Sequence, residues 1–245
     1  MQLANQNVYE VDYSVIIPAF NEEDLLPATL QNLEKTMETL PWKGEVVVVD
    51  NNSTDRTSEV AKSMGARVVF EPYNQISKAR NTGAKEARGR YFVFLDADTL
   101  LDARLLQKSL ENLDTGQCSG GGSLISFDAQ GKAWGKHVVN FANGLMKKNN
   151  LAAGCYIYAL REAFEGIGGF NEKIYASEEI WFSRRMNAWG KKHQKAFKVI
   201  LEHSVITSSR KLENTWRLLF ATLLGVFVPF SLYFRSMCFF WYKRK

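Results

Sequence analysis

The sequence predicts an α/β fold in which a mostly parallel sheet is flanked by helices. Short apolar runs alternate with segments of helical periodicity from 13 to 95, which is the pattern of parallel strands joined by crossover helices. The run at 45–50, EVVVVD, is continuously β-branched, as expected for a strand buried on both faces. Several of these runs end in polar residues, and ligands of open α/β sheets bind at the carboxyl ends of strands.

The first half of the chain is predicted to contain four strands separated by three helices. The helix that follows the first strand carries Leu26, Leu30 and Leu33 at helical spacing. The predicted strands are 13–20, 45–50, 66–70 and 90–95, and the predicted helices are 22–40, 56–64 and 77–87. No period of sequence identity accompanies this alternation, so we do not expect a repeat protein.

A pair of acids, Asp96 and Asp98, follows the apolar strand 91–95 with Ala97 between them. Two carboxylates on a tight turn provide hard oxygen ligands for Mg²⁺ or Mn²⁺, provided that a diphosphate supplies further oxygens. An isolated Asp pair is also common in ordinary turns. A dinucleotide-binding glycine motif and a P-loop are both missing, because the first strand continues into PAFNEE without a glycine. Phosphates would therefore be neutralised by a metal at Asp98.

Four motifs follow one another along the first half of the chain: PAFNEE at 18–23, VDNNSTD at 49–55, ARNTG at 79–83 and DAD at 96–98. Together they resemble the motifs of the family 2 glycosyltransferases, which have the GT-A fold. The resemblance extends from 13 to 210 and implies a nucleotide-diphosphate sugar donor, a divalent metal and inversion at the anomeric carbon. It also implies a GT-A domain at 13–211, with a nucleotide-binding half at 13–102 and an acceptor half at 103–211, after an N-terminal lead at 1–12.

The resemblance assigns roles to individual residues of the donor half. It places Asp50 against the base or ribose, Arg80 against the base or diphosphate, and Asp96 against the ribose and phosphates, with Asp98 on the metal. The residues that would line the nucleotide are Pro18, Ala19, Phe20, Asn21 and Glu22. Structural alternatives stay open at several of these positions, because Pro18 can end a strand and both Asn21 and the 50–53 cluster can cap helices.

In the acceptor half, the important pair is Glu178-Glu179, which follows a glycine-rich turn at 166–170. Direct displacement at the anomeric carbon needs a base to take the acceptor's proton, and we assign this role to Glu179. Glu178 is expected to bind acceptor hydroxyls. The usual family pair is Glu-Asp, so Glu179 is a departure that changes the reach of the base. An acid at a helix start is also favoured by the helix dipole alone.

Elements of the second half are weaker in pattern. Helices are expected at 101–113 and 134–145 and strands at 118–127, at 155–160 and at 194–202. His203 follows the last strand and is a candidate metal ligand, although a lone histidine is more often structural. Arg210 resembles a basic residue that folds back on the diphosphate.

The segment 212–245 is expected to form an apolar helical tail. Residues 218–234 carry no charge, Pro229 interrupts them, and the chain ends in Lys243-Arg244-Lys245. Part of the tail, 216–245, is expected to associate with a membrane as a span or an interfacial hairpin. The alternative is a dimerisation surface in a homodimer.

Composition limits the other possibilities. The chain has 245 residues, 46% hydrophobic, and a net charge of +5 spread along its length, which fits nucleotide phosphates or anionic lipid better than nucleic acid. Three distant cysteines suggest neither disulfides nor zinc, and the N-terminus does not resemble a signal peptide. We therefore expect a cytoplasmic protein at the inner face of a membrane.

The sequence does not specify the acceptor, which could be a sugar, a lipid or a protein. Two other hypotheses are transfer to a lipid phosphate without a base, and a non-catalytic scaffold that binds nucleotide-sugar or lipid.

Overall fold

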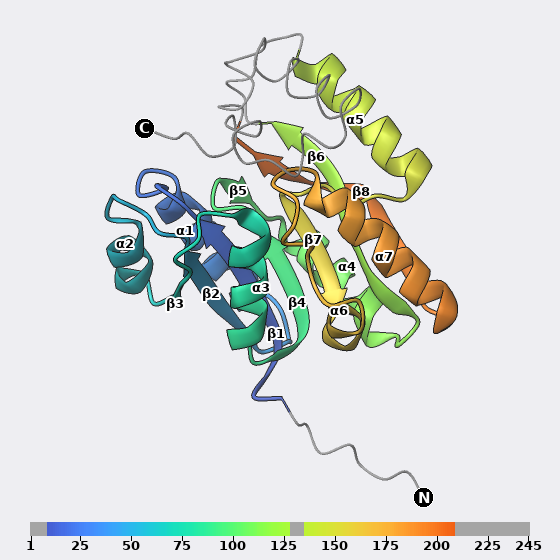
Figure 1. The fold of residues 1–245 in the computed structure, drawn as a ribbon, viewed down its shortest axis with the longest axis horizontal. Coiled ribbons are helices and arrows are strands. Elements are labelled where there is room, and N and C mark those ends of the chain that lie inside the picture. The colour runs from blue at the N-terminus through green and yellow to red at the C-terminus, as the bar shows by residue number, and fades with distance from the viewer. Residues whose placement is uncertain (1–8, 128–134, 209–245) are drawn as a thin grey trace, which may run out of the picture.

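The computed structural model describes residues 9–127 and 135–208, and a single curled sheet runs through this part of the chain (Figure 1). The strand order is β3-β2-β1-β4-β7-β6-β8-β5. The strands are β1 (Val11–Ala19), β2 (Gly44–Asp50), β3 (Arg67–Phe70), β4 (Gly89–Leu95), β5 (Thr99–Leu100), β6 (Cys118–Phe127), β7 (Tyr156–Leu160) and β8 (Ala196–Thr207). The four strands predicted in the first half are confirmed, with ends that differ by one or two residues.

The sheet is mixed, so the prediction of a mostly parallel sheet holds only for part of it. Strands β1 to β4 are parallel, with β1 between β2 and β4. Strand β7 is antiparallel to both β4 and β6, and β5 is antiparallel to β8, whereas β6 and β8 are parallel. The buried run YIYAL of β7 has the same apolar pattern in either direction, so its sequence did not reveal its orientation.

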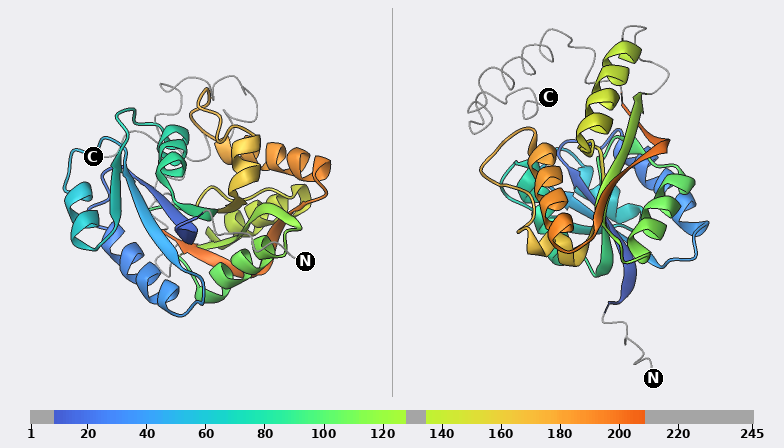
Figure 2. Two further views of the ribbon diagram at one scale, coloured as in Figure 1. Left: turned by 90° about the horizontal axis from the view of Figure 1, so that it is seen from below. Right: turned by 90° about the vertical axis from the view of Figure 1, so that its right-hand side faces the viewer.

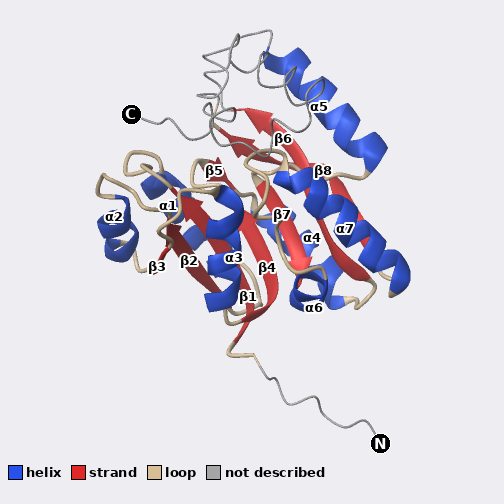
Figure 3. Cartoon of the chain, in the orientation of Figure 1, coloured by secondary structure: helices blue, strands red, loops and turns tan. Residues whose placement is uncertain are grey.

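Helices cover both faces of the sheet. Helices α1 and α4 lie on one face, and α3, α6 and α7 lie on the other (Figures 2 and 3). The helices are α1 (Leu26–Glu38), α2 (Thr57–Ser63), α3 (Ile76–Glu86), α4 (Ala103–Asp114), α5 (Gly135–Asn149), α6 (Arg161–Gly166) and α7 (Glu178–Lys192). Asp102 caps α4 by accepting hydrogen bonds from the backbone N–H groups of Arg104 and Leu105. The short helix α6 was not predicted.

A cluster of phenylalanine rings joins the centre of the sheet to α6 and α7. Phe94 of β4 packs edge-on against Phe170, with ring centroids 5.0 Å apart. Phe170 stacks on Phe182 of α7 at 4.4 Å, and the Arg80 guanidinium lies 5.1 Å from the centroid of the Phe170 ring. These contacts fix the start of α7 against β4 and α3.

Some predictions fall partly or wholly outside the described residues. Arg210 and the tail at 212–245 lie there, as do residues 1–8 of the N-terminal lead. None of the helices within 9–127 and 135–208 has the length and apolar character that crossing a bilayer requires. The division into nucleotide-binding and acceptor halves stays a prediction.

Candidate active site

A cavity of about 320 Å³ lies at the carboxyl ends of β1, β2 and β4. This volume is at the lower end of the range of small-molecule sites. The ends of β6 and β8, the loop before β7 and the start of α7 complete its wall. The predicted site residues on the wall are Pro18, Ala19, Phe20, Glu22, Arg80, Asp96, Asp98, Glu178 and Glu179. Residues from both halves of the sequence therefore meet at one edge of the sheet, as the strand-end rule predicts.

The turn after β1 is fastened to the turn after β2 by Asn21. Its backbone has a φ of 51°, in the left-handed region that Asn tolerates better than most residues. Its Oδ1 accepts a hydrogen bond from the backbone N–H of Thr54 at 2.8 Å, and its Nδ2 donates to Thr54 Oγ1 at 3.2 Å. Asn21 is not among the residues that line the cavity. In this structure it holds the loop that presents Phe20 and Glu22.

At the end of β2, Asn51 rather than Asp50 lines the cavity. Asp50 Oδ1 accepts a hydrogen bond from the backbone N–H of Ser53 at 3.0 Å and so closes the turn after β2, but it does not cap a helix, because α2 begins at Thr57. The Asn51 side chain donates to the backbone oxygens of Glu71 and Tyr73 and accepts from the backbone N–H of Gln75. Asn51 thus fixes the loop between β3 and α3. The predicted contact of Asp50 with a base or ribose stays a prediction.

The backbone of the Asp96-Ala97-Asp98 turn is held by hydrogen bonds to three other parts of the chain. Asp96 N donates to Cys155 O at 3.1 Å, and Ser208 N donates to Asp98 O at 3.2 Å. Thr29 of α1 donates to Ala97 O at 2.8 Å. The two carboxylates are therefore carried by a backbone fixed to β7, β8 and α1, and both line the cavity.

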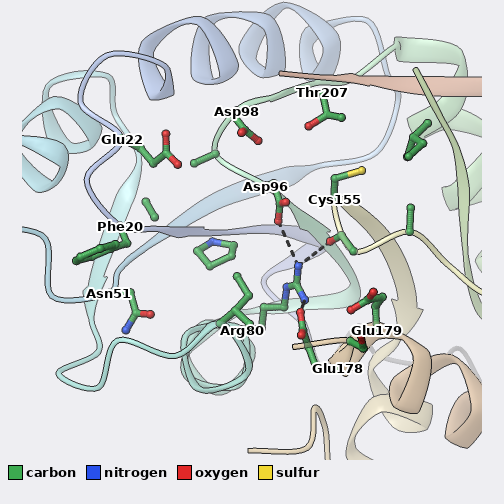
Figure 4. Close-up of a pocket in the computed structure, with 18 of the residues that line it drawn as sticks. Phe20, Glu22, Asn51, Arg80, Asp96, Asp98, Cys155, Glu178, Glu179 and Thr207 are labelled. Atoms are coloured by element: carbon green, nitrogen blue, oxygen red, sulfur yellow. Dashed lines mark hydrogen bonds and ion pairs between the residues drawn. The ribbon is translucent and has the colours of Figure 1, made fainter. Parts of the chain in front are cut away.

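Arg80 links this turn to the acid pair on α7. The residue is 2% exposed. Its Nη1 donates to Glu178 Oε1 at 2.7 Å, and its Nη2 donates to Asp96 Oδ1 at 3.2 Å and to Gly154 O at 2.6 Å (Figure 4). The two carboxylates raise the pKa of Arg80 against the opposing effect of burial, which is the largest single influence. The guanidinium is a buried bridge in this structure, so the predicted contact with base or diphosphate would have to be made beside these bonds.

Glu178 and Glu179 have different environments, although they are neighbours at the start of α7. Glu178 is buried in its ion pair with Arg80, whereas Glu179 is half-buried on the cavity wall. Loss of solvent, and then the negative charge of Glu178, raise the pKa of Glu179 to about 8. A carboxyl with a raised pKa binds a proton more strongly than an ordinary carboxyl does, which suits a proton acceptor. Only the second oxygen of Glu178 is left for the predicted contact with acceptor hydroxyls.

The residue before this pair, Ser177, has a left-handed backbone with φ of 60°. This conformation is uncommon outside glycine, asparagine and aspartate, and such local strain is found preferentially at functional sites. It directs the chain from the 170–176 segment into α7 so that both acids face the cavity. In Figure 4, Asp98 and Glu179 lie on opposite sides of Asp96, which places the turn and the proposed base at two sides of one pocket.

The charges on the cavity wall fit a divalent cation. Five carboxylates line it within the described residues, from Glu22, Asp96, Asp98, Glu178 and Glu179, and Arg80 is the one cationic side chain among these lining residues. A diphosphate would be repelled there unless a cation accompanied it. Asp96 and Asp98 offer the hard oxygen donors that Mg²⁺ and Mn²⁺ prefer. No cluster of three or more His, Cys, Asp or Glu suited to a metal occurs in 9–127 and 135–208, so the remaining ligands would come from the diphosphate and water.

His203 does not follow the last strand, as predicted, but lies inside β8. Between Ile200 and Ser204, β8 has extra residues relative to β6, and His203 belongs to this irregularity. The strand resumes and ends at Thr207, which lines the cavity together with Asp98. His203 is not among the residues that line the cavity, and its role as a metal ligand stays a prediction. The end of the strand was predicted too early because a bulge interrupts the apolar alternation.

Several residues on the wall were not predicted. They are Asn51, Asn74, Ile76, Ile125, Phe127, Ala153, Gly154, Cys155, Tyr175, Ser177 and Thr207. Asn51 could have been found, because it directly follows a predicted strand end. Apolar residues such as Ile125 and Phe127 carry no chemical signal in a sequence.

Comparisons with known proteins agree with this geometry. Residues 14–168 match the sequence model described as glycosyl transferase family 2. Glycosyltransferase AglE of Haloferax volcanii is 29% identical over 184 residues, which cover 70% of this chain and 60% of that protein. Dolichol-phosphate mannosyltransferase of Pyrococcus furiosus is 32% identical over 108 residues, which cover 42% of this chain and 30% of that protein. The chain thus matches less than two thirds of the length of these relatives.

Two solved structures show the same fold. The mannosyltransferase PcManGT from Pyrobaculum calidifontis, in complex with GDP-Man and Mn²⁺, matches with a TM-score of 0.68 and 19% identity, covering 97% of this chain and 66% of that one. S. aureus TarS 1-349, in complex with UDP-GlcNAc, matches with a TM-score of 0.63 and 19% identity, covering 87% and 67%. The family match includes more than half of the chain and all four motifs. The chain therefore belongs to glycosyl transferase family 2 and has its GT-A fold.

Proposed function

We propose that this protein transfers a sugar from a nucleotide-diphosphate sugar to an acceptor hydroxyl with inversion, and that Glu179 is the general base. The observation that carries this proposal is the meeting of Asp96 and Asp98 with Glu179 across one cavity. The same cavity is bordered by the strand ends where nucleotides bind in α/β sheets. The complexes of the two structural neighbours with GDP-Man and with UDP-GlcNAc support a nucleotide-sugar donor.

In the proposed reaction, Glu179 takes the proton of the acceptor hydroxyl as its oxygen attacks the anomeric carbon. The bond between that carbon and the diphosphate oxygen breaks, and the nucleotide diphosphate leaves with the bonding electrons. Asp98 would hold Mn²⁺ or Mg²⁺, which would offset the negative charge on the leaving diphosphate, and Asp96 would contact the ribose and phosphates. Arg80 holds Asp96 and Glu178 in place, and Glu178 keeps the proton affinity of Glu179 high.

Release of free nucleotide from a panel of nucleotide-diphosphate sugars, with Mn²⁺ and candidate acceptors, tests this proposal. We expect Asp98→Ala to abolish release and Glu179→Gln to lower kcat by about 10²–10⁴-fold, the usual contribution of a general base. Glu59→Gln, at an exposed position of α2, is the matched control and should leave the rate unchanged. Full activity of the Asp98 variant would exclude the assignment of this site.

The same experiment separates the alternatives. A lipid phosphate acceptor is already ionised and needs no base, so Glu179→Gln would then cause only a mild loss. A scaffold that only binds nucleotide-sugar or lipid would release no nucleotide with any donor or metal. Association of 216–245 with a membrane, or a homodimer formed through this segment, stays part of the proposal because the segment lies outside the described residues.

A further inference from the structure

The helix α5 has an exposed face that combines apolar and basic side chains. Phe141 is 69% exposed and Leu145 is 46% exposed, and they lie one helical turn apart. Lys147 and Lys148 are exposed in the last turn. Lys148 lies on the same face, three residues after Leu145, whereas Lys147 lies on the flank of the helix, about 120° around its axis from Phe141. The helix sequence, GKHVVNFANGLMKKN, contains no acidic residue. Large apolar side chains beside lysines, without acids, are characteristic of helices that lie in the interface of a membrane.

This helix is attached directly to the wall of the cavity. Asn143 Oδ1 accepts a hydrogen bond from Ile125 N at 3.0 Å, and Asn143 Nδ2 donates to Ile125 O at 2.9 Å. Ile125 and Phe127, at the end of β6, line the cavity. A partner that binds the outer face of α5 would therefore lie at a fixed position relative to Ile125 and Phe127 on the cavity wall.

Other apolar features occur at the same end of the molecule. Figure 1 shows α5 and β5 at the end of the sheet towards which β6 runs. The exposed residues Leu100 of β5 and Ile206 of β8 are directly opposite each other there. The described chain ends two residues later at Ser208, whose N–H is bonded to Asp98 O. The sequence beyond it contains the uncharged run 218–234 and the terminal Lys243-Arg244-Lys245.

We propose that α5 docks on an anionic lipid bilayer through the face that carries Phe141, Leu145 and Lys148, with Lys147 at its flank. The two apolar side chains enter the acyl boundary, and the lysines contact anionic headgroups. Because Asn143 bonds α5 to Ile125 on the cavity wall, this docking would hold that part of the wall close to the bilayer surface. The docking itself does not depend on the proposed sugar transfer. Together with the transfer, it indicates an acceptor that is carried by the membrane.

Co-sedimentation of the full chain with vesicles tests the docking. Vesicles of phosphatidylcholine alone are compared with vesicles of phosphatidylcholine mixed with phosphatidylglycerol. We expect the chain to bind the anionic vesicles more tightly. The double variant Lys147→Glu, Lys148→Glu should bind them at least about thirtyfold more weakly, since the loss of each basic side chain near an anionic surface costs about a fivefold factor and the new carboxylates add repulsion. Phe141→Ser with Leu145→Ser should also bind about tenfold or more weakly, through the loss of apolar burial.

Matched controls separate this surface from net charge and from apolar exposure in general. Lys191→Glu with Lys192→Glu changes the charge equally at the last turn of α7, and Met64→Ser removes an exposed apolar side chain that follows α2. Both should bind anionic vesicles like the unaltered chain. Melting temperatures and nucleotide-sugar binding check that each variant is folded.

Three results would overturn the docking proposal. One is no binding of the unaltered chain to anionic vesicles. Another is equal binding of the α5 variants and the controls, which would leave 209–245 as the sole attachment. The third is a change of oligomeric state in the Phe141, Leu145 variant without a change in vesicle binding, which would make this face an interface between copies. A failure of sugar transfer alone would affect only the proposed function.

Discussion

As the proposed general base, Glu179 would have to bind a proton strongly and yet be deprotonated when the acceptor arrives. Its position on the wall of the cavity, beside the charge of Glu178, raises its pKa to about 8. A carboxyl with the ordinary pKa near 4 would be ionised at neutral pH but would be a much weaker base. The extra methylene relative to the usual Asp lets this side chain extend from the helix start to the region of Gly154.

The raised pKa predicts the pH dependence of catalysis. If Glu179 must be deprotonated, kcat/KM should rise about tenfold per pH unit below 8 and level off above it. Glu178→Gln removes the neighbouring negative charge, so the pKa of Glu179 should fall and the rising limb should move to lower pH. A profile measured over pH 5 to 9 for both proteins, at saturating metal, tests this. If kcat/KM rose over the same pH range in both proteins, the charge of Glu178 would not be a cause of the raised pKa of Glu179.

Arg80 carries a buried charge whose partners are also acidic residues of the site. Replacing it with methionine keeps the volume of the stem but leaves Glu178 buried without its partner. We expect a loss of about 3–5 kcal/mol in the free energy of unfolding, as measured by urea titration at pH 7. Arg56→Met is the control, because Arg56 is 77% exposed in its pair with Glu23 and should cost at most about 1 kcal/mol. Equal losses in the two variants would show that the buried bridge has no special role in stability.

Among the elements, α3 connects the donor side of the cavity to the acid pair. Gln75, at the N-cap of α3, donates to Glu172 O at 2.7 Å and to Ile174 O at 3.0 Å. Asn81 Nδ2 donates to Phe170 O, and its Oδ1 accepts from Phe170 N. Gly169 has φ of 71°, and a Cβ there would lie 2.6 Å from Asn81 Oδ1, so only glycine permits this approach. These bonds hold the segment 169–174, which leads into Ser177 and α7.

This arrangement predicts that Gln75 controls catalysis without touching the reacting atoms. In Gln75→Leu, one buried and one partly buried carbonyl lose their donor, which should cost about 1–3 kcal/mol in the free energy of unfolding. The looser segment should lower kcat more than it raises KM for the donor, because the acid pair moves while the strand ends do not. Gln107→Leu, which removes an exposed bond to Glu111 on α4, is the control. A change in donor KM alone would contradict a positioning role.

The strands and helices of the parallel part of the sheet could be predicted because the spacing of apolar residues in each one indicates both its type and its buried face. β-branched runs such as VVVV in β2 can only be buried strands, and helical spacing of Leu26, Leu30 and Leu33 identifies α1. Short elements gave no such signal. The six residues of α6 and the two of β5 are too few to show a period, and the bulge near His203 hid the true end of β8.

At the scale of the whole molecule, the mixed sheet explains which parts of the site were predictable. The strand ends of β1, β2 and β4 follow one another in sequence, so their polar residues could be grouped in advance. The bond between Arg80 and Glu178 joins residues 98 apart and depends on how β7 and α7 return to the sheet. An ion pair between residues so far apart in sequence depends on tertiary packing, and it cannot be predicted from hydrophobic periodicity or from the spacing of motifs. The acid pair was recognised only through its resemblance to the family.

The account rests on the binding of the donor at a cation held by Asp98, beside Asp96. The most direct measurement is the melting temperature of the full chain with a panel of nucleotide-diphosphate sugars, with and without Mn²⁺, because a ligand that binds only the native state raises it. We expect at least one donor to raise the melting temperature when Mn²⁺ is present, and the Asp98→Ala variant to lose this increase while its own melting stays cooperative. An increase of the same size without metal, or in the Asp98 variant, would contradict the central claim.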